Sequence, residues 1–443
     1  MILKKLRYYL RLTYAFLSRF KGVLIIGALI GISVFFFANY LIPKITSTSK
    51  QNIGIAGRYL PDELPDEILS MISDGLTTFN ENAEVEPKLA INWSTPDKGR
   101  SWIFTLEEGL TWQDDTNVVT QDLNFKLDDV EVENPDEKTI IFTLIDQYAP
   151  FPGVVSKPVF KQGLLGTGEW SVDKIRLVTN FVQEISLINK NGDEKLYKIY
   201  PTEDRLKLAL KMGQVDEIHE VYDPKPFNTW GNTLEVKDEV QNGRMVTIFF
   251  NTKDRYLSDK SLRQALAYSI DKNIFDGPRA TSPIKPYSWA YNSQIKHYDH
   301  DPERAKELID EMEDEQKDGM VIKLVSTPVL LPVAEDIVEQ WKAVGIDAQV
   351  LVSSTIPSDY QAYLAIFDPP EDPDQYSIWH STQEATNISK YSNPRIDKIL
   401  EDGRVELDIE ERKKIYFDFQ RFLLEDLPAV FLYHPKTYSI IRK

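Results

Sequence analysis

Apolar residues in this chain follow the two periods of regular secondary structure, and both periods recur along its length. Alternation over residues 101–106 predicts a half-buried strand, and residues 139–144 repeat the pattern. Residues 246–250 read Val-Thr-Ile-Phe-Phe, and this apolar and β-branched composition is typical of a buried strand. Between residues 320 and 352 the pattern predicts a strand, a helix and a second strand. This order favours an α/β fold.

Helix starts are marked by acids that precede apolar residues at helical spacing. Asp259 and Asp301 each occupy such a position, so both are predicted to cap helices. A helix is also predicted near residues 66–75, with Asp62 or Asp66 as its N-cap. Later helices are predicted at 333–344, 396–400 and 410–424.

One acidic, proline-rich loop interrupts the pattern near the end of the chain. The apolar run of residues 362–367 ends at Asp368-Pro-Pro-Glu-Asp-Pro-Asp374. Proline fixes φ and lacks an amide donor, so this segment is predicted to be a rigid, non-helical loop. Two interpretations remain open for it. It is either a solvated acidic turn that ends a strand, or a ligand-binding loop at the carboxyl end of that strand.

The first 50 residues differ from the rest of the chain. Residues 22–43 contain no charged residue and are long enough to cross a bilayer as a helix. Six basic residues precede this segment and two follow it, which predicts a cytoplasmic N-terminus and an extracytoplasmic body. A cleaved signal peptide is the alternative, but its apolar core should be shorter and should end at small residues. Residues 44–52 are predicted to be a polar linker.

Charge limits the classes of partner. The 443 residues have a formal net charge of −18, and the first 50 carry eight basic residues and no acid. The remaining 43 basic and 69 acidic residues give the body a charge near −26. Such a body is a poor match for nucleic acid, whose phosphates bind basic surfaces. Cysteine is absent, which excludes disulfides, thiolate metal sites and a cysteine nucleophile.

No motif of a known enzyme class stands out. The chain lacks a Gly-x-Ser-x-Gly elbow, a phosphate-binding loop and a His-Glu-x-x-His pair. His297 and His300 have a spacing that could chelate a metal, yet they sit beside Asp299 and Asp301 at a predicted helix start. Asp372 and Asp374 lack the glycine and the distal glutamate of a calcium loop. We therefore expect no enzyme, no cofactor and no metal site, with a carboxylate-dependent hydrolase as the most distant alternative.

Several segments, taken in chain order, resemble one protein family. Two of these segments depart from the family's pattern. In residues 166–170, Glu169 stands where the family has proline, and in residues 102–122, Asp115-Thr116 stands where the family has Asp-Gly. The segments are residues 86–93, 102–122, 166–170, 206–216, 250–271, 281–292, 372–381 and 391–400. Together they resemble the family 5 extracellular solute-binding proteins, the peptide-binding receptors of ABC transporters. The helical subdomain that usually follows Asp122 in this family is predicted to be trimmed.

The resemblance implies an α/β, two-lobed, periplasmic-binding-protein-like fold of type II, here preceded by one transmembrane helix. We expect a basic cytoplasmic segment at 1–21 and the transmembrane helix at 22–43, followed by the linker. The first lobe is expected at 53–250 with 429–443 and the second at 251–428, with crossings near Phe250 and near 427–433.

The resemblance also implies a function. It predicts a monomeric, membrane-anchored receptor that captures oligopeptides or dipeptides between its lobes and delivers them to an ABC permease. The same fold can bind a different solute, such as an oligosaccharide or a metal chelate, and this alternative stays open. The family commonly places an acid before Asp-Pro-Asp to pair with the ligand's α-amino group, and Asp368 is the nearest candidate. The expected ligand-binding residues are Asp368, Glu371, Asp372, Trp379, His380, Trp289, Tyr291, Arg58, Tyr59 and Asn251.

Overall fold

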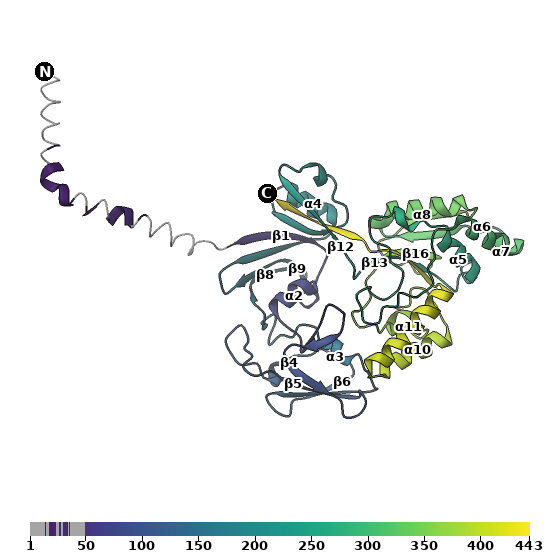
Figure 1. Cartoon of the computed structure of the whole chain (residues 1–443), viewed down its shortest axis with the longest axis horizontal. Helices are drawn as coiled ribbons and strands as arrows, with labels where there is room; N and C mark the ends of the chain where they lie inside the picture. The colour runs from purple at the N-terminus through teal and green to yellow at the C-terminus, as the bar shows by residue number, and fades with distance from the viewer. Residues whose placement is uncertain (1–13, 15–16, 24–25, 28–29, 34, 36–48) are drawn as a thin grey trace, which may run out of the picture.

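The computed structural model describes residues 14, 17–23, 26–27, 30–33, 35 and 49–443. Within these residues, no helix combines the length and the apolar character that crossing a bilayer requires. The predicted transmembrane segment, residues 22–43, lies largely outside the part of the chain that is described. The described body is an α/β structure of two lobes, each with a large sheet, and has two smaller sheets in addition (Figure 1).

A seven-stranded mixed sheet forms the centre of the first lobe. The central strand β1 (Lys50–Ala56) pairs in parallel with both of its neighbours, whereas the outer strands pair antiparallel. Helices α2 (Asp66–Ile72) and α4 (Glu203–Lys211) pack on opposite sides of the sheet. The strand order is β12 (Leu234–Val240), β18 (Lys436–Arg442), β11 (Glu217–Val221), β1, β10 (Glu194–Tyr200), β9 (Phe181–Asn189) and β8 (Trp170–Val178).

A four-stranded antiparallel sheet extends the first lobe and lies below the large sheet in Figure 1. The predicted alternation is confirmed in its central strand, where Trp102, Phe104 and Leu106 are buried in an aromatic core. The sheet order is β4 (Ala90–Ser94), β5 (Ser101–Leu106), β7 (Thr139–Leu144) and β6 (Val130–Glu133). Next to it lie the hairpin β2 (Thr77–Phe79) and β3 (Val85–Pro87) and the short helix α3 (Phe151–Val154).

The second lobe contains a five-stranded sheet with helices on both faces. One face packs against α5 (Lys260–Tyr268), α6 (Pro302–Asp310) and α8 (Leu331–Ala343), and the other against α10 (Pro394–Val405) and α11 (Ile409–Asp426). The predicted β-α-β order is confirmed by β14, α8 and β15. The sheet order is β15 (Ala348–Val352), β14 (Ile322–Ser326), β16 (Ala362–Phe367), β13 (Met245–Phe250) and β17 (Ala429–Tyr433). The short helices α7 (Asp314–Lys317) and α9 (Tyr376–Trp379) complete the lobe.

The predicted helix caps are confirmed in two places and wrong in one. Asp259 accepts hydrogen bonds from the amides of Ser261 and Leu262, and Asp301 accepts one from Arg304. At α2 the N-cap is Pro65, which offers no side-chain acceptor, so neither Asp62 nor Asp66 caps that helix.

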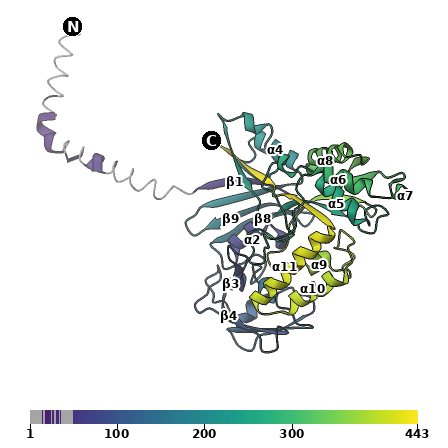
Figure 2. The same cartoon turned by 45° about the vertical axis from the view of Figure 1, so that its right-hand side comes forward.

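The chain crosses between the lobes twice, and the two crossings lie side by side. Residues 241–244 connect β12 to β13, and residues 434–435 connect β17 to β18. The expected boundaries put 245–250 and 429–433 in the first lobe, but both segments pair within the five-stranded sheet. β13 pairs with β16, and β17 pairs with β13, so both strands belong to the sheet of the second lobe and each crossing is shifted by a few residues from its expected position. In both views the yellow C-terminal part of the chain passes from the second lobe into the first, where it ends as β18 (Figures 1 and 2).

Candidate ligand cleft

A large cleft lies between the two lobes, with a volume of about 1270 Å³. Its first-lobe wall consists of residues of α2, of β2 with the turn that follows it, and of the segment 148–158. Its second-lobe wall consists of Lys285, Tyr287, the loop 368–374 and neighbouring residues of α9 and α10. The acidic loop therefore lies at the end of a strand and faces a cavity, as the ligand-binding interpretation requires.

Packing of its flanking residues fixes the loop. Phe367, the last residue of β16, packs edge-on against Phe249 of β13. At the other end, Trp379 is fully buried between these two rings, and its indole nitrogen donates to Gln375. The chain between the anchors contains three prolines, two of them buried, so the carboxylates have little freedom to rearrange.

Asp372 is held by an arginine from α11. The Arg412 guanidinium donates through Nη2 and Nη1 to the two Asp372 carboxylate oxygens, at 2.8 and 3.2 Å. Both side chains are buried, with 8% and 14% of their surface exposed. Arg412 also donates to the Gly403 carbonyl and lies against the Trp289 ring. This two-pronged ion pair attaches the loop to the helices behind it.

Glu371 and Asp368 both lie near Lys285, and Asp368 also lies near Arg244. Lys285 Nζ lies 2.5 Å from Glu371 Oε1 and 3.7 Å from Asp368 Oδ1. The Tyr287 hydroxyl donates to Glu371, and burial together with this carboxylate raises the pKa of Tyr287. Arg244 Nε lies 3.4 Å from the second oxygen of Asp368. Each of the two acids therefore already faces a cation of the chain.

Asp374 joins the second lobe to the first. Its carboxylate accepts a hydrogen bond from the Tyr148 hydroxyl at 3.1 Å and lies 3.3 Å from Arg404 Nε. The Arg404 guanidinium lies over the rings of Tyr148 and Tyr376. The main-chain carbonyl of Arg404 accepts a hydrogen bond from the Ala149 amide at 2.7 Å. Burial raises the pKa of Asp374, and Arg404 offsets only part of that effect. The two lobes thus meet at one edge of the cleft.

The first-lobe wall has a different charge pattern. Asp66, Glu67 and Glu81 line it, are exposed, and form no ion pair with any described residue. Asp74 is paired with Lys88 at 3.3 Å. Together with Lys157, an exposed cation at the same wall, these residues leave the first-lobe wall with an excess of negative charge.

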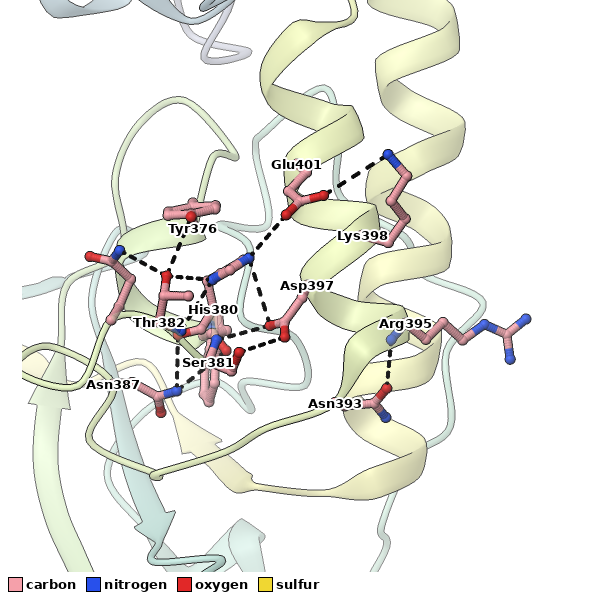
Figure 3. A network of polar contacts seen from close by, with 12 residues as sticks. Tyr376, His380, Ser381, Thr382, Asn387, Asn393, Arg395, Asp397, Lys398 and Glu401 are labelled. Carbon is pink, nitrogen blue, oxygen red and sulfur yellow. Dashed lines mark hydrogen bonds and ion pairs between the residues drawn. The ribbon is translucent and has the colours of Figure 1, made fainter. Parts of the chain in front are cut away.

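His380 lies behind the second-lobe wall in a polar network (Figure 3). Its ring stacks on the Tyr376 ring, with 4.0 Å between the two ring centroids, and its Nδ1 lies 2.8 Å from the Thr382 hydroxyl oxygen. Its Nε2 faces the carboxylates of Glu401, at 3.5 Å, and Asp397, at 4.0 Å. The ring is buried, so His380 supports Tyr376 at the wall and does not itself line the cleft.

Three of the ten expected ligand residues, Asp368, Glu371 and Asp372, line the cleft. Trp379 and His380 lie directly behind the loop. The remaining five are placed elsewhere by local packing and hydrogen bonds. Trp289 packs against the Tyr416 ring, and the Tyr291 hydroxyl is hydrogen-bonded to the Thr281 hydroxyl. Tyr59 donates a hydrogen bond to the Ala56 carbonyl, and Asn251 donates one to the Tyr360 carbonyl. Arg58 is exposed and does not line the cleft.

Several residues of the cleft were not predicted. Lys285 lies in the proline-rich segment 281–292, so a lysine flanked by prolines was a usable local signal. Tyr148 and Arg404 carried no such signal, because their contact joins segments that are far apart in the sequence. In the described part of the chain, no group of three or more His, Cys, Asp or Glu side chains could hold a metal ion.

The profile of the bacterial extracellular solute-binding proteins, family 5 (middle region), matches residues 84–387. The chain belongs to this family of extracellular binding proteins. The predicted resemblance is therefore confirmed.

Individual relatives agree with this assignment. The oligopeptide-binding protein AppA of Bacillus subtilis is 28% identical over 287 residues, which cover 56% of this chain and about half (51%) of that relative. The structure of AppA in complex with a nonapeptide has a TM-score of 0.68 at 19% identity, covering 89% of this chain and 95% of AppA. NikZ from Campylobacter jejuni in complex with Ni(L-His) has a TM-score of 0.72 at 21% identity, covering 88% and 94%. These structures share the two-lobed fold of this protein.

Proposed function

We propose that this protein is a membrane-anchored, extracytoplasmic receptor that binds peptides in the cleft between its lobes and delivers them to an ABC permease. The observation that carries the proposal is the cleft itself, which lies between two lobes joined by two short crossings. Such lobes close over a ligand by hinge motion. The relatives named for oligopeptide binding and the AppA–nonapeptide complex support peptide as the ligand class.

The chemistry of the walls suits an extended peptide. Peptide recognition combines hydrogen bonds to the main chain, charged groups for the termini and tolerant space for side chains. The cleft offers carboxylates, hydroxyls and amides on both walls and enough volume for several residues. Asp368, Glu371 and Asp372 belong to the wall that the ligand would contact, with Trp379 and His380 supporting it.

The membrane anchor is the remaining part of the proposal. Residues 22–43 are uncharged and long enough to cross a bilayer, and basic residues are concentrated before them. An anchor there would keep the receptor next to its permease. Protease added outside intact cells should digest the body, and a body that is protected would contradict this orientation.

The ligand class is tested by native mass spectrometry of the protein expressed without residues 1–48. We expect co-purified peptides that are released on denaturation. Ser70→Trp, which places a large ring in the cleft from α2, should abolish this ligand mass. Arg205→Trp, at an exposed position of α4 outside the cleft lining, is the matched control and should retain it. A bound sugar or metal chelate in place of peptide would assign the alternative ligand class.

A further inference from the structure

The second-lobe wall carries its own cations, and one of them is deeply buried. Only 6% of the Lys285 side chain is exposed, yet the residue lines the cleft. Its ammonium lies 2.5 Å from Glu371 and 3.7 Å from Asp368. A lysine in this position occupies the place that a positively charged group of a ligand would take between the same two acids.

Lys285 is also held in place, so it cannot readily move aside. Pro283 and Pro286 flank the short segment that carries it, and proline fixes φ at both positions. The Pro283 carbonyl accepts a hydrogen bond from the buried Gln375 side chain at 2.7 Å. The Lys285 carbonyl accepts one from the Ser288 amide at 3.0 Å. The lysine and the acidic loop are thus parts of one rigid wall.

Charge balance follows from these contacts. Lys285 lies against both Asp368 and Glu371, whereas Arg244 is shared between Asp368 and Glu220, which lies 3.3 Å from its Nη1. Asp372 is balanced by Arg412, and Asp374 by Arg404. A ligand ammonium at this wall would meet the positive charge of Lys285 at close range, and displacing that lysine would leave a buried cation unpaired.

We propose that Lys285 is a built-in counter-ion that determines specificity, so that the second-lobe wall accepts peptide groups without positive charge. The ligand class is a peptide whose N-terminus is blocked, or whose interior residues lie against this wall. The inference rests on the proposed peptide-binding function. It differs from the expectation that Asp368 pairs with a free α-amino group. The Lys285 inference predicts that N-acetylated peptides bind, whereas pairing of Asp368 with the α-amino group predicts that they bind poorly.

The test uses the full chain in detergent and two equimolar pools as probes, mixed-sequence tetrapeptides and the same pool after N-acetylation. Retained peptides are counted by mass spectrometry at pH 7, where the free amino group is charged. We expect the parent chain to retain the two pools within about threefold of each other. Lys285→Met, which removes the ammonium that lies against Glu371 and Asp368, should favour the free pool by at least tenfold.

Lys285→Arg keeps the charge and should behave as the parent does. A parent chain that retains free peptides and rejects acetylated ones overturns the inference while leaving peptide binding intact. Retention of neither pool contradicts the proposed function, and the inference falls with it. If Lys285→Met fails to fold, as judged by its thermal melt, the ratio measured on the parent chain still decides between the two statements.

Discussion

The two walls of the cleft are both acidic in sequence, but they differ in how their charges are used. On the second-lobe wall, Asp368, Glu371, Asp372 and Asp374 each lie against a cation of the chain. On the first-lobe wall, acids such as Glu67 have no ion pair with a described residue and remain exposed. Acidic residues that are paired within a wall build that wall, whereas unpaired ones remain available to a ligand. The number of acids in a loop therefore does not measure its capacity to bind a cation.

The largest effect is expected where both partners of an ion pair are buried, as Arg412 and Asp372 are. Arg412→Met should lower the free energy of unfolding by about 3–5 kcal/mol, because Asp372 would be left buried without its partner. Arg421→Met is the matched control on the same helix, since Arg421 forms an exposed pair with Asp418. It should cost about 1 kcal/mol or less in denaturant unfolding. Equal losses for the two variants would contradict the distinction between buried and exposed ion pairs.

A smaller effect is expected at the contact that joins the walls. Tyr148→Phe removes the hydroxyl that donates to Asp374 across the lobes, a hydrogen bond to a charged group that contributes about 1.5–3 kcal/mol. The variant should open more readily, which small-angle scattering would record as a larger radius of gyration. Tyr256→Phe, whose hydroxyl bonds the Asp318 carbonyl within the second lobe, should leave the radius unchanged.

The pH dependence of stability should report on Asp374. Burial raises the pKa of this carboxyl, so the folded chain holds its proton more tightly than the unfolded chain. Its contribution favours folding below the ordinary carboxyl pKa and is lost as the pH rises through the raised value. Asp374→Asn should remove that slope from the unfolding free energy. Asp402→Asn, an accessible acid of α10, should keep it, and a slope that persists without Asp374 would reject this assignment.

The smallest effects are expected on the first-lobe wall. Glu67→Gln and Glu81→Gln should each change stability by about 0.5 kcal/mol or less, because both side chains are exposed. Binding of a lysine-containing tetrapeptide should weaken by about two- to fivefold, and the difference should disappear at high salt. Asp204→Asn on α4 is the control with the same charge change. A loss of binding that is insensitive to salt would show that these acids have another role.

Local patterns in the sequence were sufficient for the elements and for the loop. The alternation around Phe104, the cap at Asp259 and the prolines before Asp374 depend on residues that are near one another in the chain, and each prediction is confirmed. Trp379 was expected at the cleft because it follows the loop. It lies instead in the core, because α9 turns its ring toward Phe249.

The balance of charge could not be predicted in the same way. Glu371 is 86 residues from Lys285, and Asp374 is 226 residues from Tyr148. Nothing in either local sequence specifies such a partner, since the pairs form only when separate elements pack together. The loop could therefore be located from the sequence, while the state of its carboxylates depends on tertiary structure.

The paired crossings have a mechanical consequence. β12 pairs with β18 in one lobe and β13 with β17 in the other, so the two crossings continue a two-stranded ribbon through both lobes. The Gln241 amide donates to the Pro435 carbonyl, and His434 Nδ1 lies 2.9 Å from the Arg244 carbonyl oxygen. A ribbon of this kind flexes across its thin direction and resists shear and stretching. Opening of the protein is therefore expected to be a rotation of one lobe relative to the other about a single hinge axis. Arg244 lies in one of the crossings and contacts Asp368, so it links this hinge to the loop that faces the ligand.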